Sequence, residues 1–438
     1  MAGEVEFGCR LHNTRLMAWH ESQVVHLLVG ITPRPVLRGV RMPLNLCFVL
    51  DRSDSMKEED KIETVKEAVR LALRQMQMGD AVSIVTFNNT ATVDVESSPL
   101  SDLSGLERKI DRIQASDGTR ISTGLQKGIA EVRKGHAGGH RSPNQVSRIL
   151  LLTDGETMKD EDRCLELASE CRQMGVPITA LGLGSEWNED LLYGIAERSG
   201  GIAEWLQSPD SIVDCFQNTI QQMQAASVVD VRLRLHMSRG VSAQNAYRVT
   251  PVLAALPDTL SGSSVELLLG NAEPEQLLSV YLRLRLEPRP QPGMMRLARA
   301  ELVYSVPTMN LYETREMQDI AVELCGDPSV ADPAHWHPEV RAAYEAVTTF
   351  EMTKRGQLAL RHGDLDKATQ LLGSATTRLQ ALGDAEGALA TARLLETATK
   401  LLQAKPEDAQ QAAQKLDFKD VMEHTKRLGE TVRLNQTQ

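Results

Sequence analysis

The stretch FVLDRSDSM, residues 48–56, ends an apolar run and then places two serines and two aspartates within five residues. The run that it closes, LNLCFVLD (44–51), is almost continuously apolar, which is typical of a strand buried on both faces of a sheet. Four short side chains with hard oxygen atoms follow the tip of that strand. Such a tip is a candidate cation site, and the rest of the chain decides what surrounds it.

Further along the chain, apolar runs alternate with amphipathic helical patterns. The runs are 81–88, 148–155, 176–184 and 200–207, and the helical patterns are 61–76, 120–134, 162–175, 187–200 and 208–224. Buried strands joined by helices form a mostly parallel sheet with helices on both faces. We therefore predict an α/β doubly wound, Rossmann-like domain over residues 43–226.

The flanking segments have a different period. VVDVRLRLHM (228–237) and LLSVYLRLRL (277–286) alternate strictly between apolar and polar residues, which is typical of half-buried antiparallel strands. About seven such strands are expected, two of them before the α/β region. The α/β domain is therefore predicted to be inserted in an antiparallel β-sandwich made of residues 1–42 and 227–308. Residues 309–438 have helical spacing and predict a C-terminal α-helical region, which either packs internally or docks a partner.

Composition restricts the function. The 438 residues carry 59 Asp and Glu against 48 Lys and Arg, which disfavours nucleic acid or an anionic membrane as the main partner. No apolar run approaches the length of a membrane span, so no membrane span is expected. The six scattered cysteines suggest small core residues in a reducing compartment, so we expect a cytoplasmic protein.

Five oxygen-bearing residues follow the ends of separate strands or precede a helix. They are Asp51, Ser53, Ser55, Thr119 and Asp154. In an open parallel sheet the loops after the carboxyl ends of the strands meet at one edge, so these side chains are expected to converge. Three hydroxyls and two carboxylates suit Mg²⁺ or Mn²⁺ better than Ca²⁺, which usually takes more carboxylates. The alternative, that these residues only form turns and helix caps, stays open at this stage.

This set resembles the metal-ion-dependent adhesion site (MIDAS) of von Willebrand factor type A (VWA) domains, whose motif is D-x-S-x-S with a distant Thr and the Asp of a T-D-G-type loop. The resemblance covers roughly residues 43–226. It implies that Ser53, Ser55 and Thr119 bind the metal through their hydroxyls, while Asp51 and Asp154 act mainly through water. The sequence departs from the motif at Asp54 and Asp117, where small residues are usual, and Glu156 adds a further negative charge.

The whole chain resembles cytoplasmic bacterial VWA proteins, which implies a non-enzymatic, Mg²⁺-dependent adaptor or scaffold that binds a carboxylate of a protein partner. One alternative is a subunit of an AAA+ ATPase-driven remodelling or metal-insertion complex, or of a kinase and phosphatase system. Another is a homo-oligomer in which an acidic residue completes the metal site of a neighbouring copy. An enzyme is not expected, because no histidine occurs in this group of loops to act as a base for Ser55.

Overall fold

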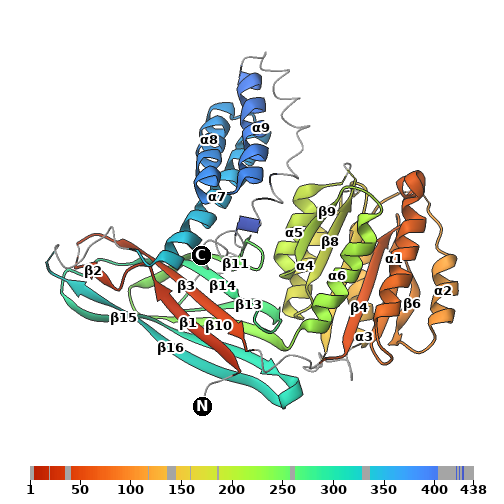
Figure 1. Cartoon of the computed structure of the whole chain (residues 1–438), viewed down its shortest axis with the longest axis horizontal. Helices are drawn as coiled ribbons and strands as arrows, with labels where there is room; N and C mark the ends of the chain where they lie inside the picture. The colour runs from red at the N-terminus through yellow and green to blue at the C-terminus, as the bar shows by residue number, and fades with distance from the viewer. Residues whose placement is uncertain are drawn as a thin grey trace.

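The computed structural model describes residues 4–18, 20–34, 41–116, 118–135, 145–157, 159–184, 187–256, 262–327 and 336–402, together with 421, 424, 427 and 428. Figure 1 shows three parts: an α/β unit, a pair of β-sheets beside it and a column of helices that rises from the sheets. The α/β unit and the sheets contribute the sites described below.

The α/β unit is built on a six-stranded sheet with the order β6-β5-β4-β7-β8-β9. Every neighbouring pair is parallel except β5 and β6. The strands are β4 (Leu44–Asp51), β5 (Ala81–Phe87), β6 (Ala91–Pro99), β7 (Val146–Thr153), β8 (Ile178–Leu183) and β9 (Ile202–Leu206). All eight residues of β4 are buried, as its continuous apolar sequence predicts. The doubly wound fold is confirmed.

Helices cover both faces of this sheet. They are α1 (Lys61–Gln75), α2 (Leu103–Asp111), α3 (Ile121–Gly135), α4 (Glu161–Gln173), α5 (Glu189–Ser199) and α6 (Ser211–Ala225). Leu46, Phe48 and Leu50 of β4 share one apolar cluster with α1, α2 and α6. Cys47 and Val49, which point the other way, share a second cluster with α3, α4 and α5. The sequence analysis missed β6 and α2, which lie at one edge of the sheet.

Two five-stranded sheets flank the α/β unit, with the orders β1-β3-β14-β11-β12 and β13-β10-β15-β16-β2. Their strands are β1 (Val5–Leu11), β2 (Arg15–Met17), β3 (Gln23–Pro33), β10 (Val228–Met237), β11 (Val241–Thr250), β12 (Ala254–Ala255), β13 (Ser264–Ala272), β14 (Leu278–Leu286), β15 (Gly293–Val306) and β16 (Leu311–Cys325). One apolar cluster contains side chains of both sheets, such as Leu27 and Leu282 from the first and Leu233 and Leu302 from the second.

The strand β16 corrects one prediction. Helical spacing was expected from residue 309 onward, but residues 311–325 form a strand that pairs with β15 along nearly its whole length and with β2 at its end. The helices begin only at Pro338. The division into residues 1–42, 43–226, 227–308 and 309–438 otherwise remains a prediction, and we propose that its last boundary follows β16.

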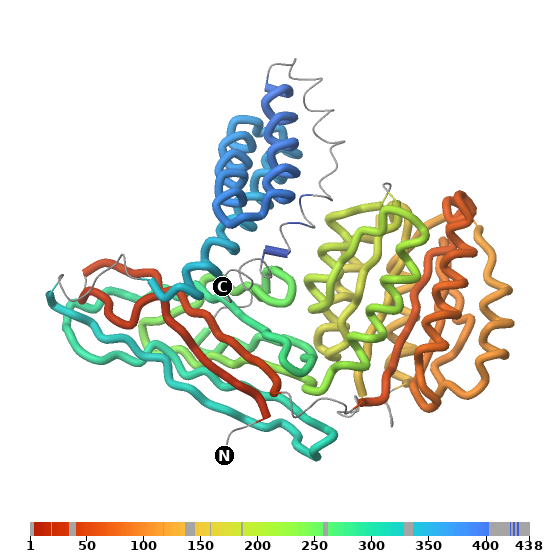
Figure 2. The backbone as a smooth tube through the Cα atoms, in the orientation of Figure 1, coloured from red at the N-terminus to blue at the C-terminus, as the bar shows by residue number. Residues whose placement is uncertain are grey.

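The described helices after β16 are α7 (Pro338–Arg361), α8 (Leu365–Leu382) and α9 (Ala385–Leu402). The first half of α7 packs on the first β-sheet, where Val347 and Phe350 share a cluster with Tyr281. Its second half packs with α8 and α9, where Leu360 and Leu372 meet. Gly383 ends α8 in the left-handed conformation, as expected for a glycine between two helices. Figure 2 shows α7 rising from the sheets toward the α8–α9 hairpin.

Candidate metal site

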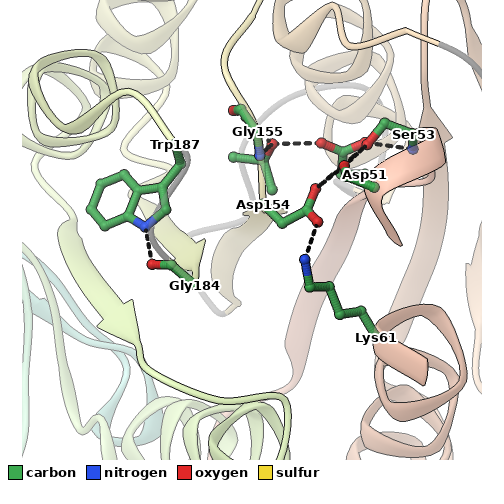
Figure 3. A network of polar contacts seen from close by, with 9 residues as sticks. Asp51, Ser53, Lys61, Asp154, Gly155, Gly184 and Trp187 are labelled. Carbon is green, nitrogen blue, oxygen red and sulfur yellow. Dashed lines mark hydrogen bonds and ion pairs between the residues drawn. The ribbon is translucent and has the colours of Figure 1, made fainter. Parts of the chain in front are cut away.

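The functional candidates lie where β4 and β7 end side by side. The two strands are parallel and in register from Leu44 opposite Val146 to Leu50 opposite Leu152. Asp51 is therefore the last residue of one strand, and Asp154 directly follows the last residue of its neighbour. Because parallel neighbours end at the same edge, both carboxylates reach one point (Figure 3).

Hydrogen bonds join four of the five predicted residues. Asp51 Oδ1 accepts the Ser53 backbone N–H at 2.8 Å. Ser55 Oγ donates to Asp154 Oδ1 at 2.7 Å, and it lies 3.0 Å from Ser53 Oγ. Asp51, Ser53 and Asp154 are each no more than 3% exposed. These oxygens thus face one another in a largely buried cluster.

Thr119, the fifth predicted residue, is brought to the same edge by its loop. The loop is fixed to the β4 tip, because Ser116 N donates to the carbonyl of Arg52 at 2.7 Å. Gly118 has a φ of +86°, and a Cβ there would lie 2.1 Å from Asn89 Oδ1, so the turn requires glycine. A Cβ placed on Gly155 would lie 3.8 Å from Thr119 Oγ1, which puts this hydroxyl beside the loop that carries Asp154.

The loop after Asp154 also caps the helix that follows Thr119. The first free amides of α3 donate to this loop: Ile121 N to Thr157 Oγ1 at 3.1 Å, and Ser122 N to Asp160 Oδ2 at 2.8 Å. Side-chain caps of this kind satisfy amides that have no partner within the helix. Two chain segments nearly forty residues apart are therefore held as one unit at the strand ends.

Two polar contacts at the site were not predicted. Lys61, the first residue of α1, donates from Nζ to Asp154 Oδ2 at 2.8 Å, and its side chain is only 14% exposed. Thr153 Oγ1 donates to Asp51 Oδ2 at 2.5 Å. The sequence did contain a signal for Lys61, because a positive charge in the first turn of a helix interacts unfavourably with the helix dipole. A lysine at this position therefore suggests a nearby carboxylate that compensates for it.

The electrostatics of the cluster are those of two carboxylates withdrawn from water. The pKa of Asp51 is raised to about 6, mainly by burial and also by the negative charge of Asp154. Hydrogen bonds from Thr153 and Ser53 lower this pKa but do not outweigh the burial. Lys61 is the cation that contacts Asp154. A second positive charge would therefore be stabilised between these carboxylates.

The residues fit a hard divalent cation. The donor set contains carboxylate and hydroxyl oxygens and no nitrogen or sulfur, which matches Mg²⁺ or Mn²⁺. Ser53 Oγ and Ser55 Oγ already face Asp154 Oδ1, at 3.5 and 2.7 Å. The additional acidic residues near the motif are exposed and are not part of the buried cluster. Asp54 pairs with Lys57, and Glu156 is exposed. Asp117 lies outside the described residues.

Trp187 forms part of the same edge. It lies in the loop between β8 and α5, where its Nε1 donates to the carbonyl of Gly184 at 3.0 Å (Figure 3). The indole covers Gly182, where a Cβ would lie 2.1 Å from the ring. The indole of Trp187 is therefore held against the end of β8, and glycine at 182 leaves the room that the ring requires.

A mostly parallel sheet with helices on both faces, and with a cluster of carboxylate and hydroxyl side chains at its carboxyl edge, is the arrangement expected of a VWA domain. The sequence profile of the von Willebrand factor type A domain matches residues 45–217. This part of the chain therefore belongs to the VWA family, as the motif resemblance predicted.

Comparison with known proteins extends the likeness beyond that domain. An uncharacterised protein of Synechocystis is 28% identical over 349 residues, which are 76% of this chain and 78% of that protein. Human inter-alpha-trypsin inhibitor heavy chain H2 is 28% identical over 188 residues, which are 41% of this chain and 20% of that protein.

Solved structures share the fold of the whole chain. A von Willebrand factor type A protein from Catenulispora acidiphila superimposes with a TM-score of 0.75 at 18% identity and covers 96% of both chains. The ArnB paralogue VWA2 from Sulfolobus acidocaldarius gives a TM-score of 0.60 at 15% identity, over 98% of this chain and 99% of that one. The combination of VWA domain, β-sheets and helices is therefore an architecture that recurs. Among the described residues, no helix is both long and apolar enough to cross a bilayer.

Proposed function

We propose that the VWA domain binds Mg²⁺, or Mn²⁺ in its place, and that the bound ion takes a carboxylate from a protein partner. The observation that carries the proposal is the contact of Ser53 and Ser55 with Asp154, beside Asp51. Hydroxyl ligands leave the ion less neutralised than carboxylate ligands would, and it then attracts an external carboxylate. In this role the protein is an adaptor or scaffold.

The residues of the chain have distinct parts in this proposal. Ser53, Ser55 and Thr119 would hold the ion through their hydroxyls, and Asp51 and Asp154 would supply the negative charge. Thr153 orients Asp51 through its 2.5 Å hydrogen bond. When bound, the ion supplies a Lewis-acidic position for a partner's carboxylate.

We further propose that the site is not catalytic. The Ser55 hydroxyl donates a hydrogen bond to Asp154, and the ammonium of Lys61 pairs with that same carboxylate. A serine nucleophile needs a base that withdraws its proton, and a carboxylate already paired with an ammonium is a poor one. Ser55 is therefore a hydrogen-bond donor in this arrangement rather than an activated nucleophile.

Three kinds of partner could supply the carboxylate. We propose first a separate protein with an accessible acidic residue. The alternative is a complex with an AAA+ ATPase or with a kinase and phosphatase system. In the third form, a second copy of this chain supplies the acid. We also keep the cytoplasm as the proposed compartment, on the ground that five of the six cysteines are buried in a way that suits core residues.

Calorimetric titration of the full chain with Mg²⁺ tests the proposal. The test variant changes both Ser53 and Ser55 to Ala, and the matched control changes Ser98 and Ser101 to Ala, which are exposed in the edge strand β6 and just after it. We expect saturable binding in the wild type and the control, and none in the test variant. Equal heats in all three proteins, with and without added glutarate as a carboxylate donor, would refute the proposal.

The same proteins distinguish the partners. Sedimentation of the pure wild type with Mg²⁺ or with EDTA shows whether a second copy supplies the acid, since then the assembly depends on the ion. A monomer in both conditions leaves a separate protein as the source. Purification from cells at high Mg²⁺, compared with the serine double variant, then shows whether an ATPase is retained.

A further inference from the structure

The strand β16 leaves most of one edge without a partner strand. One side of β16 pairs with β15 along nearly its whole length, whereas β2 pairs on the other side with residues 323–325 alone. No other strand in the described part of the chain pairs with residues 312–322 on that side. Figure 1 shows β16 at the lower border of the two sheets, away from helices α8 and α9. An open edge of this length offers backbone N–H and C=O groups to a further strand.

The contacts of β16 with β2 show which of its backbone groups point outward. Glu323 N donates to the carbonyl of Thr14 at 2.8 Å, and Ala18 N donates to the carbonyl of Cys325 at 2.8 Å. The backbone groups of successive residues in a strand point to opposite sides. Those of residues 315, 317, 319 and 321 therefore point outward, as those of Glu323 do. The side chains of these residues are exposed as well, so a second strand can reach this edge.

The other edges of the two sheets are short or contact another part of the chain. The strand β12 has two residues. The β13 edge meets the VWA domain, where Arg172 Nη2 donates to the carbonyl of Leu268 at 3.3 Å. The β1 edge contacts β16 through a side chain, because Cys9 N donates to Gln318 Oε1 at 3.0 Å. Gln318 is one of the alternate, half-buried residues of β16, so this contact lies on the inner side of the strand. Among the described strands, β16 therefore has the longest edge left for a partner.

The exposed side chains along this edge are complementary to themselves. Met317 is 60% exposed and lies between Arg315 and Asp319 in the run REMQD (315–319). The side chains of Arg315 and Asp319 are 54% and 47% exposed. When two copies of the run pair antiparallel with Met317 opposite itself, Arg315 of each copy lies opposite Asp319 of the other. Two attractive charge pairs then flank a contact between two methionines.

The neighbouring registers bring like charges together. A pairing centred one residue earlier places Glu316 opposite itself and Glu313 opposite Asp319. A pairing centred one residue later places Glu313 opposite Glu323 and loses both attractive pairs. Like charges directly opposite each other in a sheet are destabilising, so the charges favour the pairing centred on Met317. The open edge agrees with this register, because residue 317 is the midpoint of residues 312–322.

We propose that two copies of this chain associate through β16, antiparallel and about a two-fold axis at Met317. Residue 315 pairs with 319, 317 with 317 and 319 with 315, and each pair exchanges backbone hydrogen bonds. Within each copy Arg315 Nη1 stays 3.4 Å from Glu301 Oε1. Asp319 Oδ1 likewise stays 2.7 Å from Arg299 Nε, because both of these contacts are made to β15. The inference is independent of the metal-dependent partner binding proposed above and goes beyond it, since the assembly carries two VWA domains.

Charge reversal tests the pairing, measured by sedimentation of the full chain in EDTA. A single strand pair is a small interface, so we expect wild-type dimers with a Kd on the order of 10 µM, unchanged by Mg²⁺. Arg315→Asp and Asp319→Arg each place like charges opposite each other twice and should weaken dimerisation at least about tenfold. A mixture of these two variants should form heterodimers about as tightly as the wild type, because every facing pair is then opposite in charge. Lys400→Asp is the control, because it changes the net charge as much as Arg315→Asp at an exposed site on α9, and it should dimerise like the wild type.

A second variant avoids the ion pairs with β15. Met317→Lys changes a side chain that is 60% exposed, so its folding should be unaffected, and it places two ammonium groups opposite each other at the axis. It should weaken dimerisation as well, and thermal melting verifies the fold of every variant. A wild type that stays monomeric at the highest concentration measured overturns the proposal. Single variants that dimerise like the wild type overturn it too, and so does a mixture of Arg315→Asp with Asp319→Arg that forms no heterodimer.

Discussion

Replacement of Lys61 by Met should destabilise the metal-free protein and strengthen its binding of Mg²⁺. The substitution keeps most of the aliphatic stem and removes the ammonium that lies 2.8 Å from Asp154 Oδ2. Asp154 is then left as a buried carboxylate with no cation in contact. Both effects follow from the same loss, since Mg²⁺ can replace the missing charge.

The magnitude follows from the burial of the pair. The Asp154 side chain is inaccessible to solvent, and that of Lys61 is 14% exposed. Breaking a buried ion pair by removing one partner costs about 3–5 kcal/mol. The partial exposure of Lys61, and the ability of Asp51 to take up a proton, reduce this to about 2 kcal/mol. A thermodynamic cycle then allows Mg²⁺ to bind the variant up to about 30-fold more tightly.

Hydrogen exchange and calorimetry measure the two effects separately. Amides of β4 and β7 in the variant should exchange up to about 30-fold faster in EDTA, and saturating Mg²⁺ should restore much of their protection. Lys57→Met is the matched control, because Lys57 pairs with Asp54 in the short 3-10 helix (Asp54–Asp60) just before α1, but both side chains are more than half exposed. An exposed pair contributes at most about 1 kcal/mol. Unchanged exchange and affinity in Lys61→Met, or equal changes in the control, would refute the reasoning.

Three further predictions concern other contacts. The pKa of Asp51 rises from 3.8 to about 6 on folding, so its contribution favours folding at low pH and is lost as the pH rises through 6. In EDTA, Asp51→Asn should therefore be neutral near pH 4 and stabilising by about 3 kcal/mol near pH 8, as pH-dependent denaturation would show. Arg361→Ala should speed amide exchange in α5 about tenfold, because it breaks the partly buried ion pair of Arg361 with Glu189 of α5, whereas Lys400→Ala, at an exposed pair, should leave this exchange unchanged. Gly182→Ala should cost about 2 kcal/mol by forcing Trp187 from its place, visible as a red shift of tryptophan emission.

The central strands of the VWA domain and the position of its site could be predicted because the apolar runs are visible in the sequence. The apolar run 44–51 ends at Asp51 because the next residues belong to a loop, and parallel topology then carries Ser53, Ser55 and Asp154 to one edge. The contact of Lys61 with Asp154 was not predicted, because a long side chain can reach many partners. Only the packing of helix α1 in the folded protein places Lys61 next to Asp154.

The strand β16 shows where local patterns fail. LYETREMQDIAVELC contains many residues with good helix propensity, and in its first half nearly every side chain is half-buried or exposed. The pairing with β15 extends from Gly293 opposite Leu324 to Val306 opposite Leu311 and outweighs that propensity. The ion pairs of Arg361 with Glu189 and of Lys354 with Glu197, which join α7 to α5, were beyond sequence reasoning for a related reason, since contacts between domains follow no period along the chain.

The hydrogen bonds at the strand ends explain how the proposed cation site can be formed before a cation arrives. Asp51 and Asp154 repel each other at the ends of neighbouring strands, and burial adds to the cost of their charges. Lys61 contacts Asp154, while Thr153 and the backbone N–H of Ser53 donate to Asp51. Each carboxylate is thus compensated by a different means, and Ser55 is positioned by Asp154 in turn. An ion that bound at the proposed site would meet oxygens that are already oriented, so its binding would not first have to order these side chains.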